Sequence, residues 1–227
     1  NNNNTTVKYL RNLSKVVNLA KTRGLIQTNP IDLLPLKMQT VEREFLTQDE
    51  LKRLEEKQIG ISRLEQVRDI FLFCCLTGLA YVDVASLNME NIVEGKRGRQ
   101  WLRKARNKTN NMCNIPLLRP ALRILEKYAE YRTATGRLLP VPSNQKMNAY
   151  LKELATLCGV TKNLTTHCAR HTFATTVTLA NGASLENVSK MLGHSSVRMT
   201  QHYAKILNSS IERDMDKIES ELIGEDE

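Results

Sequence analysis

Apolar residues recur at helical spacing along most of the chain, beginning close to its N-terminus. There they occupy every third or fourth position, at Val7, Leu10, Leu13, Val17 and Ala20. This spacing predicts a helix, and Gly24 stands where a left-handed C-terminal cap is expected. Pro30 and Pro35 then favour a turn and an extended linker that reaches residue 40. Because one helix cannot bury its own apolar stripe, residues 1–40 are predicted to be the end of a helical domain plus a linker.

A denser series of helix signals follows the linker. Thr47–Glu50 and Ser62–Glu65 both have the pattern of a capping box, in which a hydroxyl residue is followed three positions later by glutamate. The helix after the second box becomes wholly apolar at 70–76, which is typical of a central core element. Thr77-Gly78 is expected to end that helix, and a further short helix is predicted at 81–87.

Residues 91–118 change to the spacing of β-strands. Strand-forming runs lie at 92–93, 100–102 and 112–118, and turn residues separate them at 95–98 and 107–111. This alternation predicts a small three-stranded antiparallel sheet. Its middle strand and the turn after it are strongly basic, with Arg103, Lys104, Arg106 and Lys108.

The remainder of the chain returns to helical spacing. Helices are predicted at 122–129 and 147–157, then from a cap at Thr166 to Asn181-Gly182, and from a cap at Ser184 to Gly193. A last apolar stripe, which predicts an amphipathic tail helix, consists of Ile211, Met215, Ile218 and Leu222. Residues 41–227 are therefore predicted to form a mixed α/β, mainly α-helical domain with a small three-stranded antiparallel sheet.

The charge balance indicates a polyanionic partner. The 227 residues include 33 Lys and Arg against 24 Asp and Glu, a net charge of +9, and the pI is near 9.4. Five cysteines form no CxxC pair, which argues against a zinc ribbon or a disulfide scaffold. The longest apolar run, 70–82, is too short to span a bilayer, and no signal peptide opens the chain. An intracellular protein without a membrane partner is expected.

All four histidines lie between positions 167 and 202, among basic and hydroxyl residues. His167, Arg170 and His171 share one face near the start of a predicted helix, where backbone N–H groups and the helix dipole favour an anion. His194 follows one helix later, and Tyr203 lies nine residues beyond it. The first two histidines are also spaced like a metal-binding pair, but the glutamate of H-E-x-x-H is missing. We therefore expect neither a metal ion nor another cofactor.

At these positions the sequence resembles the tyrosine recombinases, also called phage-type integrases. The matching motifs are His167-Cys-Ala-Arg-His171, Leu192-Gly-His194 and Thr200-Gln-His-Tyr203. The resemblance spans about 41–210, and 1–30 is similar to the end of the family's core-binding domain. It implies a catalytic domain at 41–227 with the fold of DNA breaking-rejoining enzymes. The implied activity is site-specific recombination through a 3′-phosphotyrosine, for integration and excision of a mobile element.

The resemblance also implies a role for each site residue. Tyr203 is the expected nucleophile, and Arg170, His167, His171 and His194 are expected to stabilise the transition state. Cations and hydrogen-bond donors are needed there, because a phosphodiester under attack concentrates negative charge on its non-bridging oxygens. Lys108 resembles the family's hairpin lysine, which protonates the departing 5′ oxygen.

One residue departs from the family pattern. The usual T-G-L-R-x-x-[E/D] stretch reads Thr77-Gly-Leu-Ala80-Tyr-Val-Asp83, so Asp83 keeps the acidic position while Ala80 cannot contact a phosphate. We expect Arg106 to replace the missing guanidinium, because residues i and i+2 of a strand point to the same side and Lys108 would then lie beside it. Arg103 and Lys104 are assigned to contacts with the DNA backbone.

The expected partners are double-stranded DNA attachment sites and other copies of the chain in a homotetramer, with DNA-bending accessory proteins as further candidates. The expected location is the cytoplasm, in association with the nucleoid. Three alternatives stay open from the sequence: an enzyme similar to type IB topoisomerases, a DNA-binding protein whose active site has decayed at Ala80, and a metal-dependent hydrolase.

Overall fold

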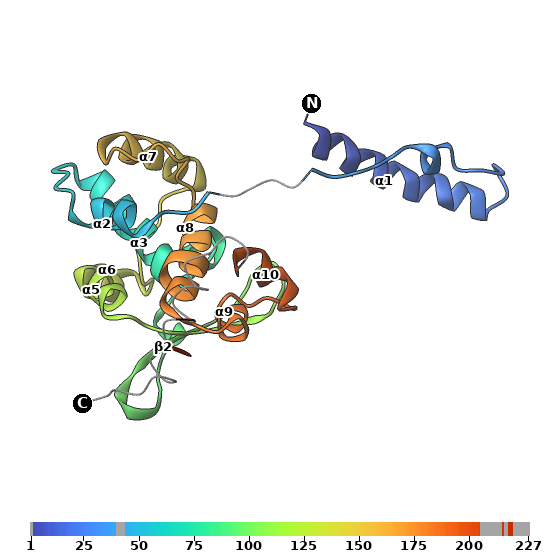
Figure 1. The fold of residues 1–227 in the computed structure, drawn as a ribbon. Coiled ribbons are helices and arrows are strands. Elements are labelled where there is room, and N and C mark those ends of the chain that lie inside the picture. Colours follow the sequence, from blue (N-terminus) through green and yellow to red (C-terminus); the bar gives the residue numbers. More distant parts are fainter. Residues whose placement is uncertain (1, 40–43, 205–214, 216–217, 220–227) are drawn as a thin grey trace. The chain divides into compact units, whose positions relative to one another are not determined.

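The computed structural model of the chain describes residues 2–39, 44–204, 215 and 218–219. The chain divides into two compact units, Asn1–Glu42 and Arg43–Glu227 (Figure 1). The predicted tail helix lies outside the described residues except for Met215 and Ile218, which are exposed. Within the described parts, no helix is both long and apolar enough to cross a bilayer.

The first unit consists of one long helix and the segment that folds back on it. Helix α1 (Asn3–Thr22) ends before Gly24, whose φ of 71° is left-handed, as the sequence predicts. The following Asn29 caps a short 3₁₀ helix, Pro30–Leu33, that the sequence pattern did not predict. Asn29 also donates hydrogen bonds from Nδ2 to the side chains of Ser14 (2.9 Å) and Asn18 (3.0 Å).

The second unit surrounds helix α8, which packs beside α3 in the middle of the unit, with α9 and α10 close by (Figure 1). Its α-helices are α2 (Gln48–Glu56), α3 (Ser62–Thr77), α4 (Tyr81–Ala85), α5 (Arg119–Lys127), α6 (Ala129–Thr135), α7 (Asn144–Leu157), α8 (Thr166–Thr172), α9 (Leu185–Met191) and α10 (Arg198–Ala204). Helix α3 is buried nearly all round, because Phe71, Phe73 and their apolar neighbours form the centre of the core.

The predicted antiparallel sheet is confirmed. Strands β1 (Ile92–Glu94), β2 (Gln100–Ala105) and β3 (Met112–Pro116) lie in the order β1-β2-β3. Leu102 of β2 lies opposite Ile115 of β3, and both are buried. Lys104 lies opposite the buried Cys113 on the same face, whereas Arg103 is on the other face and is exposed.

Several predicted helix ends differ from the structure. The capping box at Thr47 is confirmed, but the one at Ser62 is wrong: Ile61 is the N-cap residue, and the Glu65 carboxylate accepts the N–H of Gly60 instead. The cap predicted at Thr166 lies one residue earlier, where the hydroxyl of Thr165 accepts the N–H of Cys168 at 3.0 Å.

Two predicted helices also have different lengths. The helix predicted at 81–87 ends at Ala85, because the Ser86 hydroxyl donates to the carbonyls of the last turn. The helix predicted at 122–129 is two helices that meet at Tyr128, whose hydroxyl donates a hydrogen bond to Asp69.

Helix α8 does not continue as a regular α-helix. It passes into a π-helix, Phe173–Thr178, and then into a 3₁₀ turn that ends at Gly182. Two threonines one turn apart hold the backbone of Leu46 there: the N–H of Leu46 donates to Thr172 Oγ1 (2.9 Å), and the hydroxyl of Thr176 donates to the Leu46 carbonyl. The first described residues of the larger unit are thereby joined to the helix that carries Arg170.

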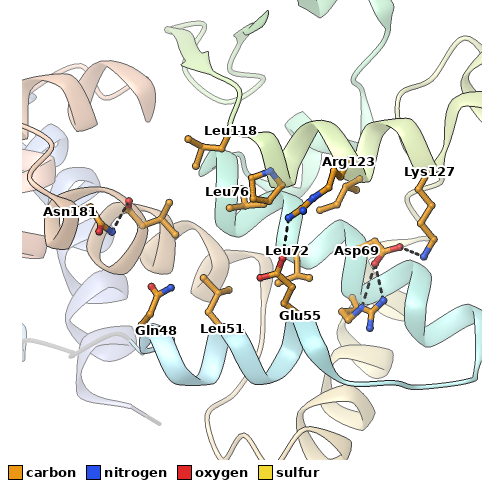
Figure 2. A pocket seen from close by; sticks show the side chains of 14 residues that line it. Gln48, Leu51, Glu55, Asp69, Leu72, Leu76, Leu118, Arg123, Lys127 and Asn181 are labelled. Atoms are coloured by element: carbon orange, nitrogen blue, oxygen red, sulfur yellow. Dashed lines mark hydrogen bonds and ion pairs between the residues drawn. The ribbon is translucent and has the colours of Figure 1, made fainter. Parts of the chain in front are cut away.

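A buried carboxylate connects α3 with α5 at the edge of an apolar groove of about 750 Å³ (Figure 2). Asp69 is buried, and its Oδ2 accepts hydrogen bonds from Lys127 Nζ (2.6 Å) and the Tyr128 hydroxyl (2.9 Å). Its other oxygen faces the guanidinium of Arg68. Because Lys127 and Tyr128 lie at the C-terminal end of α5, this carboxylate of α3 fixes the position of α5 against α3.

Replacing Asp69 with alanine is expected to lower the free energy of unfolding by about 2 kcal/mol, since the half-buried Tyr128 hydroxyl loses its acceptor. Urea denaturation measures this change. The matched control is Glu153→Ala, which removes an exposed carboxylate that pairs with Arg63 and should leave the melting temperature nearly unchanged. Equal effects of the two substitutions would contradict the assignment.

Candidate active site

Arg170 lies at the centre of the candidate site and is almost completely buried. Its Nη1 donates to the carbonyl of Gly78 and its Nη2 to the carbonyl of Leu192, each at 2.6 Å. Gly78 ends α3 with a φ of 68°, and Leu192 ends α9. Carbonyls at helix C-termini have no partner within the helix and carry the negative end of its dipole. The Arg170 guanidinium therefore joins the C-terminal ends of two helices.

Burial and, after it, the neighbouring guanidinium of Arg106 lower the pKa of Arg170 to about 10, against the opposite influence of Tyr203. A group with this pKa is still protonated at neutral pH. The two carbonyls use two of the five guanidinium N–H groups, so three are left for a ligand.

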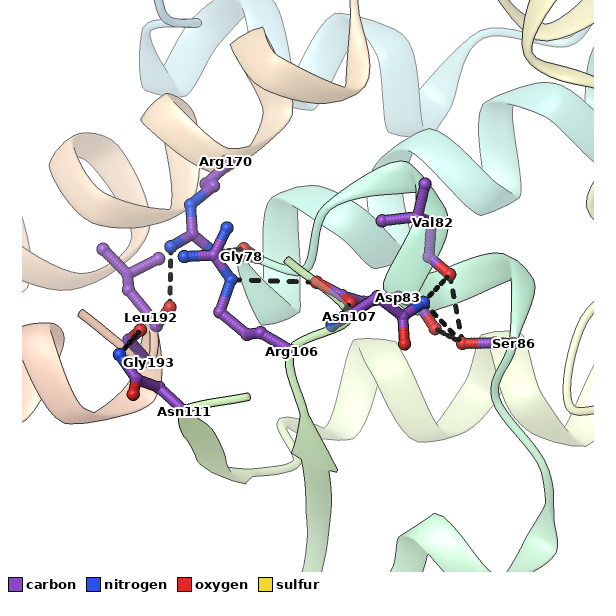
Figure 3. Close-up of polar contacts among 10 residues, drawn as sticks. All are labelled: Gly78, Val82, Asp83, Ser86, Arg106, Asn107, Asn111, Arg170, Leu192 and Gly193. Carbon is purple, nitrogen blue, oxygen red and sulfur yellow. Dashed lines mark hydrogen bonds and ion pairs between the residues drawn. The ribbon is translucent and has the colours of Figure 1, made fainter. Parts of the chain in front are cut away.

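Arg106 lies beside Arg170, between Asp83 and Gly193, and the two guanidinium groups are neighbours in Figure 3. Its Nε is 3.8 Å from Oδ2 of the buried Asp83. A Cβ added at Gly193 would come within 2.9 Å of Arg106 Cδ, so the arginine chain packs directly on the glycine. Among the described residues, the buried Nε–H of Arg106 has no hydrogen-bond acceptor.

The alternation of side chains along a strand, from which Arg106 was expected to face the site, does not apply to this residue. Arg106 nevertheless reaches Arg170. Strand β2 ends at Ala105, and Arg106 and Lys108 belong to a turn in which the rule of alternating faces does not hold. Tertiary contacts with Asp83 and Gly193 place the Arg106 side chain instead. Lys108 is exposed in the turn and makes no hydrogen bond or ion pair with the part of the chain that the structure describes.

His194 follows the left-handed Gly193 and is half-buried. Its Nδ1 lies 2.8 Å from the hydroxyl of Thr200 on α10. Burial, together with the positive charges of Arg170 and Arg106, lowers the pKa of His194 to about 4. The imidazole is therefore neutral at pH 7, and one ring nitrogen is fixed by the threonine.

Tyr203 is buried on α10 and is surrounded by imidazoles. Its ring centroid lies 3.9 Å from that of His202 and 5.2 Å from that of His171. His171 is itself buried and stands edge-on to the exposed His167, with 4.5 Å between the ring centroids. The structure thus brings α8 and α10 together at the phenol.

The site contains residues that the sequence reading did not select. His202 was not among the expected site residues, yet its ring contacts the phenol ring of Tyr203. Thr200 orients His194, and the thiol of Cys113 lies under Gly193, where an added Cβ would come within 2.8 Å of the sulfur. The motif Thr200-Gln-His-Tyr203 was the available signal for the first two. No three His, Cys, Asp or Glu side chains are grouped as metal ligands in the described ranges.

Comparison with known proteins identifies the family. A model described as Phage integrase family matches residues 44–209. The chain is 42% identical to the tyrosine recombinase XerD of Staphylococcus saprophyticus over 71 residues, 31% of this chain and 24% of that protein. It is 30% identical to the tyrosine recombinase XerA of Pyrococcus furiosus over 183 residues, 74% of this chain and 60% of that protein.

A solved structure of similar fold is a lambda integrase dimer bound to a COC′ core site. It has 21% sequence identity and a TM-score of 0.67, over 86% of this chain and 57% of that chain. The chain thus spans less than two thirds of the length of each of these three proteins.

The lowered pKa of His194 predicts a pH-dependent contribution to stability. The ordinary pKa of histidine is 6.5, and that of His194 in the folded chain is about 4. Between these two pH values the unfolded chain binds a proton at this residue and the folded chain does not. The contribution is therefore complete above pH 6.5 and is lost as the pH falls towards 4. Urea denaturation at several pH values should show that the difference in free energy of unfolding between the parent and His194→Asn becomes smaller as the pH falls from 6.5 towards 4. A difference that is constant with pH would contradict the assignment.

Gly193→Ala is expected to destabilise the protein more than Gly136→Ala. Both glycines have φ values near 60–70°, so each substitution carries the strain of a left-handed residue, about 1 kcal/mol. Only at Gly193 would the new Cβ collide with Arg106 and Cys113, whereas at Gly136 nothing lies within 4 Å. Thermal unfolding of both variants measures the difference, and equal melting temperatures would show that Arg106 does not pack on Gly193.

Proposed function

The chain belongs to the phage integrase family, whose model covers residues 44–209, and from this membership we propose that it is a tyrosine-type site-specific recombinase. It cleaves and rejoins double-stranded DNA through a 3′-phosphotyrosine, in the integration and excision of a mobile element. The observation that carries the proposal is the position of Tyr203, whose ring lies 5.2 Å from that of His171 on α8, the helix that also carries Arg170.

The proposed reaction forms one bond to phosphorus and breaks another. The phenol proton passes to an adjacent imidazole, His171 or His202, and the Tyr203 oxygen bonds to phosphorus. The bond from phosphorus to the 5′ oxygen breaks, and this oxygen takes a proton from the Lys108 ammonium. A phenol with a pKa of about 10 is mostly protonated at pH 7, so the cations beside it are needed for its ionisation. Attack by a 5′ hydroxyl from a partner strand reverses these steps.

Four groups stabilise the charge that develops on the non-bridging oxygens. Arg170 offers the N–H groups that no described residue accepts, and Arg106 offers the Nη end of its guanidinium, because its Nε is buried and faces Asp83. His167 and the neutral His194 donate further hydrogen bonds. Arg106 thereby takes the place of the arginine that the family usually carries at the position of Ala80, and Asp83 holds it there.

The proposed partners follow from the same assignment. The similar structures include lambda integrase as a dimer on a core site and as a tetramer bound to a Holliday junction. For this chain we propose attachment-site DNA, held by Arg103 and Lys104, and a homotetramer that joins two duplexes. DNA-bending accessory proteins and a location at the nucleoid belong to the same proposal.

A covalent adduct tests the nucleophile. When the full chain is incubated with a nicked duplex that carries the attachment site, the cut strand should stay bound to the protein in SDS, and Tyr203→Phe should form no adduct. A DNA-binding protein with a decayed site gives no adduct in either case. An enzyme similar to type IB topoisomerases forms the adduct but relaxes a supercoiled plasmid without exchanging strands between two duplexes.

Removal of Arg106 tests the substitute arginine. Arg106→Ala should slow adduct formation by about 100-fold, the typical effect of losing one donor that stabilises a transition state. Arg63→Ala is the control, because it removes an exposed arginine that pairs with Glu153 on the surface. Single-turnover rates measure both variants. Cleavage by Arg106→Ala at the rate of the parent would show that another group fills the position.

A further inference from the structure

The turn between β2 and β3 carries both cations that the proposed reaction takes from the sheet, Arg106 and Lys108. The turn is closed by its own backbone, since the N–H of Arg106 donates to the Asn111 carbonyl (2.9 Å) and the N–H of Asn110 donates to the Arg106 carbonyl (2.8 Å). These bonds shape the turn but do not fix it to the rest of the domain. The contacts between the turn and the helices therefore decide where the two cations lie.

Asn107, which stands between the two cations, joins the turn to helix α4. Its side-chain Nδ2 donates to the carbonyl of Val82 at 3.0 Å and lies 3.4 Å from the hydroxyl oxygen of Ser86 (Figure 3). Helix α4 has five residues, so most of its carbonyls have no partner within the helix. The asparagine amide supplies a donor to one of them, the Val82 carbonyl, which also accepts the Ser86 hydroxyl.

The backbone of Asn107 makes a third bond to the same helix. Its N–H donates to Oδ1 of Asp83 at 2.8 Å, while Oδ2 of the same carboxylate faces Arg106 Nε. Asp83 is buried, so this bond is shielded from water. One carboxylate thus holds two consecutive residues of the turn.

The opposite side of the turn is attached to the end of α9. Asn111 Nδ2 donates to the carbonyl of Gly193 at 3.3 Å, directly before His194. The turn is therefore fastened at both ends, to α4 by Asn107 and to the Gly193 backbone by Asn111. Of these attachments, only that of Asn107 lies next to both Arg106 and Lys108 in the sequence.

We propose that Asn107 is a positioning residue for cleavage: its amide docks the turn on α4 and so sets the positions of the Arg106 guanidinium and the Lys108 ammonium together. This inference rests on the proposed recombinase function. Loss of the amide lets the turn move without unfolding the sheet, whose ladder ends at Ala105 and Met112.

The test compares two leaving groups in single-turnover cleavage. With an ordinary phosphodiester, Asn107→Ala should form the Tyr203 adduct on the order of 100-fold more slowly, the size expected when a reacting group is misplaced by about 1 Å. With a 5′-bridging phosphorothiolate the leaving thiolate needs no proton, so the part of the loss that is due to Lys108 should be recovered. With the phosphorothiolate, Lys108→Ala should regain the full cleavage rate of the parent, so it serves as the reference. Asn107→Ala should regain only part of that rate, because Arg106 is misplaced as well.

Two variants separate positioning from folding. Asn107→Asp keeps the size of the side chain but removes the two amide donors, and it should reproduce the loss. Thr109→Ala is the control in the same turn, because the Thr109 side chain makes no hydrogen bond with the described residues, and it should cleave as the parent does. Melting temperatures of all variants should lie close to that of the parent.

Three results would overturn the proposal: cleavage by Asn107→Ala and Asn107→Asp within twofold of the parent, an equal loss with oxygen and sulfur leaving groups, or a loss that follows the melting temperature. Failure of the proposed function looks different, because the parent itself would then form no adduct that depends on Tyr203.

Discussion

The site depends on the compensation of one buried positive charge. The Arg170 guanidinium is stabilised by the carbonyls of Gly78 and Leu192, which lie at the ends of α3 and α9. Without the guanidinium both carbonyls would be buried and unpaired, and without the carbonyls the charge could not be buried. The left-handed glycines at the two helix ends make this arrangement possible, because they turn the chain sharply where the carbonyls must point inward. His194, Arg106 and Cys113 all take their positions from the backbone that Arg170 holds.

Local patterns predicted much of the fold and part of the site. The three strands, the cap at Thr47 and the end of α1 at Gly24 are specified by residues that are close in sequence, and all are found in the structure. The break at Tyr128 and the docking of Leu46 depend on partners that are far apart in the chain, so spacing could not reveal them. Likewise, helical spacing predicted one helix from 166 to 181, but the π-helix within it follows from hydroxyl bonds and packing that are visible only in the folded chain.

The position of Arg106 does not follow from strand alternation, and its replacement of the missing arginine stays a prediction. Strand alternation was expected to direct its side chain, yet the residue follows the end of β2 and is directed by Asp83 and Gly193. Asp83 lies three residues after Ala80 and keeps the acidic position of the family pattern. Asp83 therefore links α4 to the turn after β2. It faces Arg106 of that turn, whereas the start of its own helix carries Ala80 in place of an arginine.

The neighbouring guanidiniums of Arg106 and Arg170 have a consequence for the lifetime of the protein. Each disfavours the charge of the other in the folded chain, and this repulsion is absent once the chain unfolds. A bound anion relieves the repulsion in the folded form, and a ligand that binds this form in preference to the unfolded one raises the share of the chain that resists proteolysis.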